Sequence, residues 1–146
     1  MKVVVQRSNS SNVLVNNKEV GSIDKGLVLL VGFHIDDNIK DVEYIANKVL
    51  NLRIFDDEKG TMNLSIKDIN GSILSISQFT LYADTTQGNR PSYMNAMNGE
   101  NAINLYKCFN ETLRKNVKVE EGIFGAEMEL NIQNDGPVTI IIASKK

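Results

Sequence analysis

The chain has 146 residues, a formal net charge of −2 at pH 7 and a pI of about 5.4. Hydrophobic residues make up 42% and charged residues 23%, a balance typical of globular proteins, which excludes disorder of the whole chain. A chain of this length can bury a stable core without the help of disulfides or bound metal ions. We therefore expect a single domain over residues 1–146. The acidic balance argues against a protein that covers a long stretch of nucleic acid, but it allows one that binds only the end of an RNA.

Cysteine content and hydropathy bear on the compartment. Cys108 is the only cysteine, so an intrachain disulfide is excluded and a reducing compartment is favoured. The apolar run at Val3–Val5 is too short for a signal peptide, and no stretch approaches the roughly 20 apolar residues that span a bilayer. We therefore expect a cytoplasmic protein with no membrane contact.

Strands dominate the first third of the chain. Val3–Arg7 predicts the first of them. Asn16-Asn17-Lys18 predicts a hairpin turn between strands at Asn12–Val15 and Glu19–Ile23, because asparagine tolerates positive φ. The nearly continuous apolar run within Gly26–Phe33 predicts a strand that is covered on both faces.

A helix follows this first group of strands. Apolar residues recur at helical spacing over Ile39–Leu50, and Asp36 and Asp37 offer side chains that would cap the start of the helix. A strand is expected at Leu52–Phe55. The pattern in this region is therefore one amphipathic helix and one short strand.

The second half alternates between strands and one further helix. Asn70-Gly71 is a strong hairpin signal and leads into a long strand expected at Ser72–Tyr82. The remaining elements are a polar loop at Thr85–Pro91, a helix at Glu100–Lys115, strands at Val117–Glu120 and Glu127–Gln133, a break at Asn134–Pro137 and a last strand at Val138–Ala143. Many strands and two main helices indicate a single α+β domain with largely antiparallel sheets.

Side chains that commonly carry catalysis are scarce. His34 is the only histidine and stands at the end of a predicted strand, where a structural or exposed role is more common than a catalytic one. With Cys108 inside a helical pattern, the chain lacks the usual ligands of a zinc site and the members of a Ser-His-Asp or Cys-His arrangement. It also lacks a glycine-rich phosphate loop. We therefore expect neither a metal ion nor a cofactor.

Two short segments are chemically unusual. One predicted strand carries a cluster of hydroxyl and amide side chains, Ser75, Ser77, Gln78 and Thr80. In a strand such residues more often face the surface or a neighbouring strand, and a threonine without an adjacent base is a poor nucleophile. The other segment is Gly136-Pro137, for which the pattern predicts an ordinary trans turn, since X–Pro bonds in folded proteins are cis only about 5–6% of the time.

Ser77-Gln78-Phe79-Thr80-Leu81 and Asn134-Asp135-Gly136-Pro137-Val138-Thr139 form two unbroken motifs. In these motifs the chain resembles the D-aminoacyl-tRNA deacylase family, also called the D-tyrosyl-tRNA deacylase family. The likeness extends over nearly the whole length through Val4–Arg7, Asn51–Phe55, Met62–Ser65, Gly88–Ser92 and Gly122–Ala126. The order and spacing of these pieces make the resemblance specific, and it implies the fold of that family.

The resemblance implies a hydrolase. The family's enzymes cleave the ester that joins a D-amino acid to the 3′-terminal adenosine of tRNA, they can also accept glycine, and their members are homodimers. In the family a cis Gly-Pro peptide of one subunit enters the active site of the other, which assigns this role to Gly136 and Pro137. The implied partners are aminoacyl-tRNA and a second copy of the chain, and the implied task is chiral proofreading in translation.

The resemblance also implies how selectivity arises. An L-amino acid would aim its side chain at the rigid Gly136-Pro137 backbone, whereas a D-amino acid would aim it away, so the wrong substrate is rejected by a clash. Arg7 is expected to hold the inserted loop by donating hydrogen bonds to the carbonyls of that loop. The alternative for Arg7 is a surface ion pair at the end of the first strand.

The other motif is expected to carry the hydrolysis. Thr80 occupies the place of the family's once-favoured nucleophile, but no base is near it in sequence. We instead expect the ribose 2′-hydroxyl of the terminal adenosine to help activate the attacking water. The backbone N–H groups of Phe79 and Thr80 would then bind the developing oxyanion. Ser77 and Gln78 would position the adenosine and the ester.

Two other functions remain open. A sister type of this fold removes L-alanine wrongly loaded on a threonine tRNA and has a trans Gly-Pro peptide; the intact Ser77–Leu81 motif favours the D-specific type. A non-catalytic nucleic-acid-binding module on the same scaffold is the second alternative. The acidic balance and the absence of a basic stripe count against it.

Overall fold

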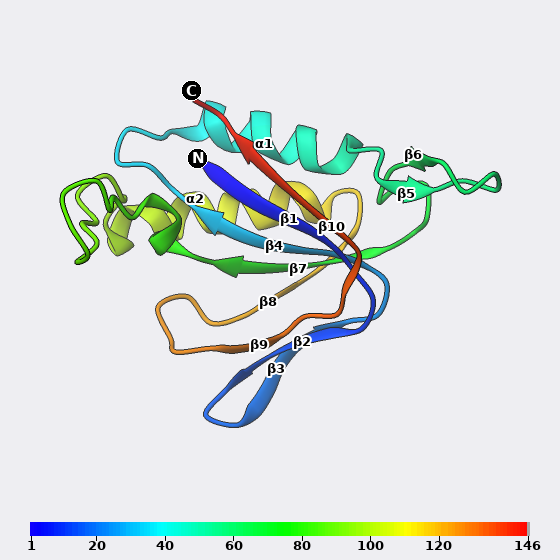
Figure 1. Cartoon of the computed structure of the whole chain (residues 1–146), viewed down its shortest axis with the longest axis horizontal. Helices are drawn as coiled ribbons and strands as arrows, with labels where there is room; N and C mark the ends of the chain where they lie inside the picture. Colours follow the sequence, from blue (N-terminus) through cyan, green and yellow to red (C-terminus); the bar gives the residue numbers. More distant parts are fainter. Residues whose placement is uncertain (146) are drawn as a thin grey trace.

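A computed structural model describes residues 1–145 of the chain (Figure 1). Within these residues the chain forms ten strands, two α-helices and one short 3-10 helix. In chain order they are β1 Lys2–Ser8, β2 Ser11–Val15, β3 Lys18–Ile23, β4 Gly26–Gly32, α1 Ile39–Asn51, β5 Phe55–Asp56, β6 Met62–Leu64, β7 Ser72–Ser77, η1 Phe79–Tyr82, α2 Gly99–Arg114, β8 Lys118–Glu121, β9 Glu129–Asn131 and β10 Asn134–Ala143. None of the helices described is long and apolar enough to cross a membrane.

Five strands form the main sheet, in the spatial order β10-β1-β4-β7-β8. β1 pairs antiparallel with both β10 and β4, whereas β7 pairs parallel with both β4 and β8. Two smaller antiparallel sheets, β3-β2-β9 and β5-β6, complete the fold. The expected α+β class with two main helices is confirmed, but the main sheet is mixed, because β4, β7 and β8 run in the same direction.

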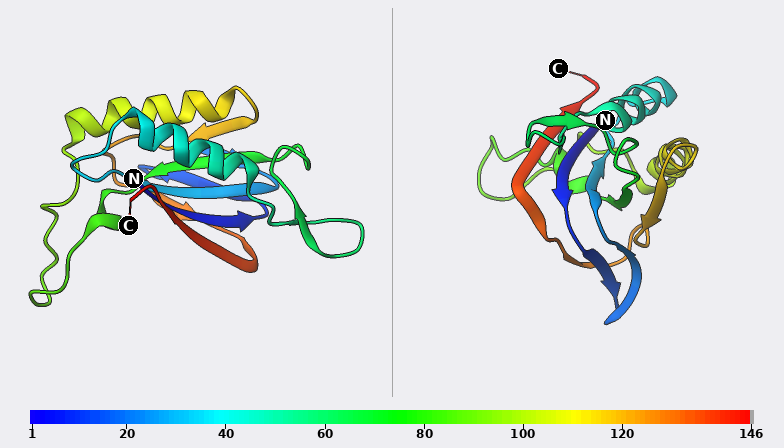
Figure 2. Two further views of the ribbon diagram at one scale, coloured as in Figure 1. Left: turned by 90° about the horizontal axis from the view of Figure 1, so that it is seen from above. Right: turned by 90° about the vertical axis from the view of Figure 1, so that its right-hand side faces the viewer.

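The main sheet lies between two layers. Both helices lie on one side of it (Figure 2), and the larger apolar core lies between them and the sheet. Alternate residues of β4 serve the two layers: Leu27, Leu29 and Val31 belong to the helix-side core, whereas Val28 packs in a second cluster against the β3-β2-β9 sheet. The prediction that this strand is covered on both faces is therefore confirmed.

The hairpin predicted at Asn70-Gly71 is wrong. Asn70 does take a positive φ of 54°, but the Ser72 N–H donates to the carbonyl of Lys25 at 3.1 Å and starts β7 parallel to β4. Gly26 allows this close approach, since a Cβ at that position would lie 1.7 Å from the Ser72 carbonyl oxygen. An Asn-Gly pair specifies only the local turn, and the partner of the following strand is set by tertiary packing.

Most other boundaries are close to the expected ones. The turn at Asn16-Asn17 is confirmed, with positive φ at both residues, and the second helix spans Gly99–Arg114 as predicted within one residue at each end. The strand expected at Leu52–Phe55 is wrong for its first three residues, because β5 begins only at Phe55. The last strand begins earlier than predicted, since Asn134–Pro137 already belongs to β10.

The cap of α1 also differs from the prediction. Asn38 is the N-cap residue: its side chain accepts a hydrogen bond from the Lys40 N–H, and Asp41 accepts one in return from the Asn38 N–H at 2.9 Å. This reciprocal pair is a capping box. Asp36 and Asp37, the expected caps, lie two residues and one residue too early. Asp37 has a different role.

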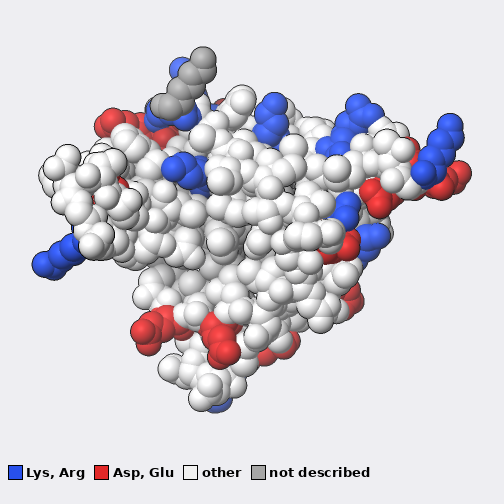
Figure 3. Space-filling model, viewed as in Figure 1, with Lys and Arg blue, Asp and Glu red and all other residues white. Residues whose placement is uncertain are grey.

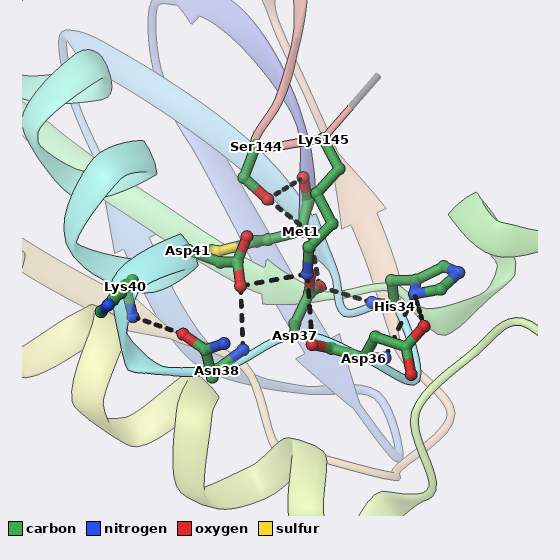
Figure 4. A network of polar contacts seen from close by, with 9 residues as sticks. All are labelled: Met1, His34, Asp36, Asp37, Asn38, Lys40, Asp41, Ser144 and Lys145. Atoms are coloured by element: carbon green, nitrogen blue, oxygen red, sulfur yellow. Dashed lines mark hydrogen bonds and ion pairs between the residues drawn. The ribbon is translucent and has the colours of Figure 1, made fainter.

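Asp37 is the centre of a buried ionic network (Figure 4). Its side chain is fully buried and forms an ion pair with the equally buried α-ammonium group of Met1. Lys145 bridges Asp37 at 2.8 Å and Asp41 at 3.2 Å, and the backbone N–H of His34 donates to Asp37 at 2.6 Å. The network therefore joins the start of β1, the start of α1 and the segment after β10.

Acid should weaken this network through Asp41. Burial alone would raise the pKa of the Asp41 carboxyl. Hydrogen bonds from Ser144, the Asn38 N–H and Lys145 instead lower this pKa from 3.8 to about 2. A carboxyl whose pKa is lower in the folded chain stabilises the fold above its unfolded pKa, and this contribution is lost as the pH falls toward the folded pKa.

We predict that the free energy of unfolding of the wild type falls more steeply from about pH 4 to about pH 2 than that of Asp41→Asn. The reason is that the variant has no carboxyl to protonate at this position. Urea denaturation at a series of pH values measures both slopes. Equal slopes for the two proteins would contradict the prediction.

Candidate active site

The chain leaves the main sheet at the first polar motif. β7 ends at Ser77, and the Gln78 N–H donates to the Val31 carbonyl at 2.7 Å before the chain turns into the 3-10 helix η1. The long strand predicted to reach Tyr82 is therefore wrong beyond Ser77. The physical reason is that β4, the neighbour of β7, ends at Gly32, so the residues that follow find no ladder partner there.

Gly32 shapes this turn. A Cβ at position 32 would lie 2.9 Å from the Gln78 carbonyl oxygen and 3.1 Å from Cβ of Leu81. A side chain there would push the turn away from the end of the sheet. The absence of a side chain at Gly32 thus lets the motif pack directly against β4.

The turn redirects the side chains of the motif. The predicted strand is replaced by η1 from Phe79 onward, so the side chains of Phe79 and Thr80 no longer alternate as they would in a strand. The Gln78 side-chain amide donates to the Thr80 hydroxyl. Phe79 is 57% exposed, and its ring meets the ring of Tyr93 edge to face at 5.0 Å between centroids.

A cavity of about 590 Å³ opens beside the motif. It lies between the ends of β4 and β7, the residues before and at the start of α2, and the 124–130 segment. Ser77, Gln78 and Phe79 line it, but Thr80 does not. Most other lining residues are apolar or glycine, including Met97, Phe124 and Met128. Sequence reasoning missed these three as site residues, because they carry no catalytic group.

The cavity contains no evident base. Its lining, drawn from the described residues, holds no carboxylate, histidine, lysine or cysteine. His34 lies outside the lining; its ring meets the ring of Tyr82 at 5.4 Å between centroids and accepts a hydrogen bond from the Asp36 N–H. Cys108 is half-buried on α2. Within this chain, polar contacts to a substrate in the cavity would come from the side chains of Ser77, Gln78, Tyr93 and Asn98 and from backbone groups.

The second motif forms a bulge on the edge strand β10. The register between β1 and β10 shifts between Gln6 and Ser8, so Arg7 alone stands opposite residues 135–138. Gly136 has a φ of 117°, and both Gly136 and Pro137 are exposed. The Gly136–Pro137 peptide bond is cis, so the trans turn expected from the pattern is wrong.

Arg7 lies beneath this bulge and is 9% exposed. It donates to the Ile54 carbonyl at 2.9 Å, and its Nε lies 3.1 Å from the Asp135 carboxylate. A weaker contact joins it to Asp56 at 3.6 Å. Within one chain Arg7 donates to the Ile54 carbonyl and not to a carbonyl of the bulge, and it is buried where a surface ion pair would be exposed. Its contacts with an inserted loop of a second copy stay a prediction. Arg7 therefore links β1 to the residue before β5 and to the bulge, through its buried contacts with Ile54 and Asp135.

The two motifs lie at opposite ends of the sheet. Ser77 aligns with Val31 in β4, and Val31 aligns with Val3 in β1, whereas Asn134 aligns with Ser8. Val3 and Ser8 are about 17 Å apart along β1 at the usual strand rise. β10 and β7 are also separated by β1 and β4 (Figure 1). The bulge of one chain therefore cannot reach the cavity of the same chain.

Gly32 offers a test of the site's architecture. We predict that Gly32→Ala destabilises the fold by about 1–3 kcal/mol, the usual cost of overpacking, because the new methyl group would meet the Gln78 carbonyl at 2.9 Å. The matched control is Gly99→Ala, whose nearest neighbour would be an ordinary contact at 3.8 Å. Thermal and urea denaturation measure both. Equal stability of the two variants would contradict the close packing at Gly32.

Known proteins resemble this chain over its whole length. The model of the family described as D-Tyr-tRNA(Tyr) deacylase matches residues 4–143. A D-aminoacyl-tRNA deacylase of Thermosipho melanesiensis is 56% identical, over 100% of this chain and 99% of the relative. One of Clostridium perfringens is 54% identical, again over 100% of this chain and 99% of the relative.

Two solved structures share the fold. One, described as a c-Myc DNA Unwinding Element Binding Protein, is 41% identical and superposes with a TM-score of 0.95 over 100% of both chains. The other, described as "a probable eukaryotic D-amino acid tRNA deacylase", has a TM-score of 0.83 over 97% of both chains. Its identity of 18% shows the fold alone.

The fold and the two motifs define a deacylase-type α+β domain. The chain belongs to the D-Tyr-tRNA(Tyr) deacylase family. The resemblance predicted from the sequence is thereby confirmed.

Proposed function

We propose that this protein hydrolyses the ester bond of D-aminoacyl-tRNA and releases free D-amino acid and tRNA. The observation that carries the proposal is membership of the family over residues 4–143. The cavity beside Ser77–Phe79 supports it, because an apolar hollow with a few polar groups at one side is typical of small-ligand sites. With this activity the protein would act in the cytoplasm as a quality-control step in translation.

The reaction is an addition of water to the ester carbonyl followed by loss of the tRNA 3′-oxygen, which takes up the proton. We place the ester beside Gln78 and η1. The backbone N–H groups of Phe79 and Thr80 open the 3-10 turn and have no acceptor within it, so they are suited to bind the oxyanion that forms. Ser77 and Gln78 would position the adenosine and the ester.

The substrate itself is assigned the activation of the attacking water, for which the cavity lining offers no base. Because the cavity lining holds no carboxylate or histidine, we assign the activation of water to the 2′-hydroxyl of the terminal adenosine. The Thr80 hydroxyl accepts a hydrogen bond from Gln78 and has no base beside it in the lining. A hydroxyl without a base is a weak nucleophile.

Replacing Thr80 separates the two mechanisms. We predict that Thr80→Ala keeps deacylation of D-tyrosyl-tRNA within about tenfold of the wild type, the effect of one or two lost hydrogen bonds. Loss of a true nucleophile costs about a million-fold in a hydrolase. Single-turnover measurement with D-tyrosyl-tRNA decides between these magnitudes. A fall of about a million-fold would establish Thr80 as the nucleophile.

We propose that the active protein is a homodimer in which Gly136-Pro137 of each subunit enters the cavity of the other. The separation of the two motifs within one chain supports this arrangement. So does the position of the bulge on an edge strand. Ile141 of β10 is 66% exposed and aligns with half-buried Val4, which leaves an open apolar strip beside the bulge. The middle of this face also carries few charged side chains (Figure 3).

Selectivity would follow from the shape of the inserted backbone. A D-amino acid directs its side chain away from Gly136-Pro137, whereas an L-amino acid directs it into that backbone and is rejected. Glycine has no side chain, so glycyl-tRNA would also be accepted. The inserted backbone would thus exclude L-amino acids without contacting the side chain of the D-amino acid.

Mixed dimers test the insertion. Ala126→Trp fills the cavity with a large side chain and should abolish turnover. Gly136→Ala should relax selectivity, because its methyl group would lie 2.8 Å from a Val138 methyl carbon and 3.1 Å from the Arg7 guanidinium. A dimer of the two variants has one open cavity, and the bulge that enters this cavity is the unaltered one.

We predict that co-expression with excess Ala126→Trp restores the D-over-L preference of Gly136→Ala. The preference is the ratio of kcat/KM for D- and L-tyrosyl-tRNA, and heterodimers are purified with two different tags. An unchanged, relaxed ratio in the heterodimer would mean that each bulge acts on its own subunit or not at all.

Two alternatives give different outcomes in the same assay. Preferred cleavage of L-alanyl-tRNA would indicate the sister type. Nucleic-acid binding without hydrolysis is favoured by the described DNA-binding role of the 41% identical structure, and the net charge of −2 counts against it. Retained RNA binding with no deacylation of any aminoacyl-tRNA would establish that second function.

A further inference from the structure

The bulge at Gly136-Pro137 is fastened by one side chain, Asn134. Its amide nitrogen donates to the Val138 carbonyl at 3.1 Å and to the Arg7 carbonyl at 3.0 Å. Its amide oxygen accepts from the Thr139 hydroxyl at 3.2 Å and, more weakly, from the Gln6 side chain at 3.5 Å. Both donors and the acceptor of the amide are thus in use.

These contacts replace the backbone hydrogen bonds between β1 and β10 that are missing at the bulge. Arg7 stands alone opposite residues 135–138, so regular pairing of β1 with β10 is interrupted there. Pro137 has no N–H to donate. The carbonyl of Arg7, inside the interruption, and that of Val138, at its far end on β10, accept from the two donors of Asn134 instead. The Asn134 side chain therefore spans the bulge from one end to the other and fixes it to β1.

We propose that Asn134 is a positioning residue for chiral selection: by joining Val138 to Arg7 across the bulge, it sets the direction in which Gly136-Pro137 projects. The inference rests on the proposed function of Gly136-Pro137. It gives the first and last residues of the Asn134–Thr139 motif a physical task, because the Thr139 hydroxyl holds the amide oxygen and so orients the two donors.

The primary test is Asn134→Asp. This change keeps the size of the side chain and its acceptor oxygen but removes both donors. The matched control is Asn131→Asp, which also exchanges an amide for a carboxylate but removes a bond to Asn12 on the β2-β9 pair, outside the bulge. Gly136→Ala is measured beside them as the variant that changes the bulge itself.

The readout is the ratio of kcat/KM for D- and L-tyrosyl-tRNA, with the melting temperature of each variant. We expect Asn134→Asp to lower the D-over-L ratio about tenfold, as the loss of two hydrogen bonds would, and Asn131→Asp to leave it unchanged. A merely structural role would lower the melting temperature and leave the ratio intact, and this outcome overturns the inference.

The failure of the inference differs from that of the proposed function. If Gly136→Ala lowers the ratio and Asn134→Asp does not, the proposed function stands and the inference is overturned. If the wild type shows no D-over-L preference, both are overturned. Should Asn134→Asp not fold, Thr139→Val removes only the exposed hydroxyl that orients the amide; an unchanged ratio in that variant overturns the inference as well.

Discussion

The directions of the strands in the main sheet govern the arrangement of the site. Because β4 and β7 run parallel, their carboxyl ends lie at the same end of the sheet, and the cavity opens there beside Ser77 and Gln78. β10 runs antiparallel to β1 and begins at the opposite end of the sheet, where it carries Gly136-Pro137. No change of side chains alters this separation. A function that requires both motifs in one place therefore requires a second copy of the chain.

The chemistry of the cavity follows from what its walls contain. Apolar residues such as Phe124 and Met128 exclude water and offer no proton acceptor. Ser77 and Gln78 bring polar groups to the cavity where β7 ends and η1 begins, because β4 ends at Gly32 and strand pairing stops there. Such a site binds and orients an ester better than it attacks one, which is why an RNA hydroxyl is assigned the part that a histidine plays in many hydrolases.

The structure corrects the sequence-based expectations where a distant contact outweighs a local signal. Asn70-Gly71 forms its turn, but the parallel partner of β7 is chosen by a close approach to Gly26. Asp37 has the right residue type for a helix cap, yet it neutralises the buried ammonium group of Met1, and Asn38 caps α1 instead. Arg7 lies beside the bulge as expected, but a carboxylate and the Ile54 carbonyl hold it.

The sequence by itself determined the class of fold, the Asn16-Asn17 turn, the second helix and the two motifs, because periodicity and turn chemistry are local properties of the chain. The tertiary structure alone decided the end of β7 at Ser77, the cavity and the bulge opposite Arg7. These features depend on where neighbouring strands stop and how their registers meet. Residues far apart along the chain set both, so no window of sequence contains them.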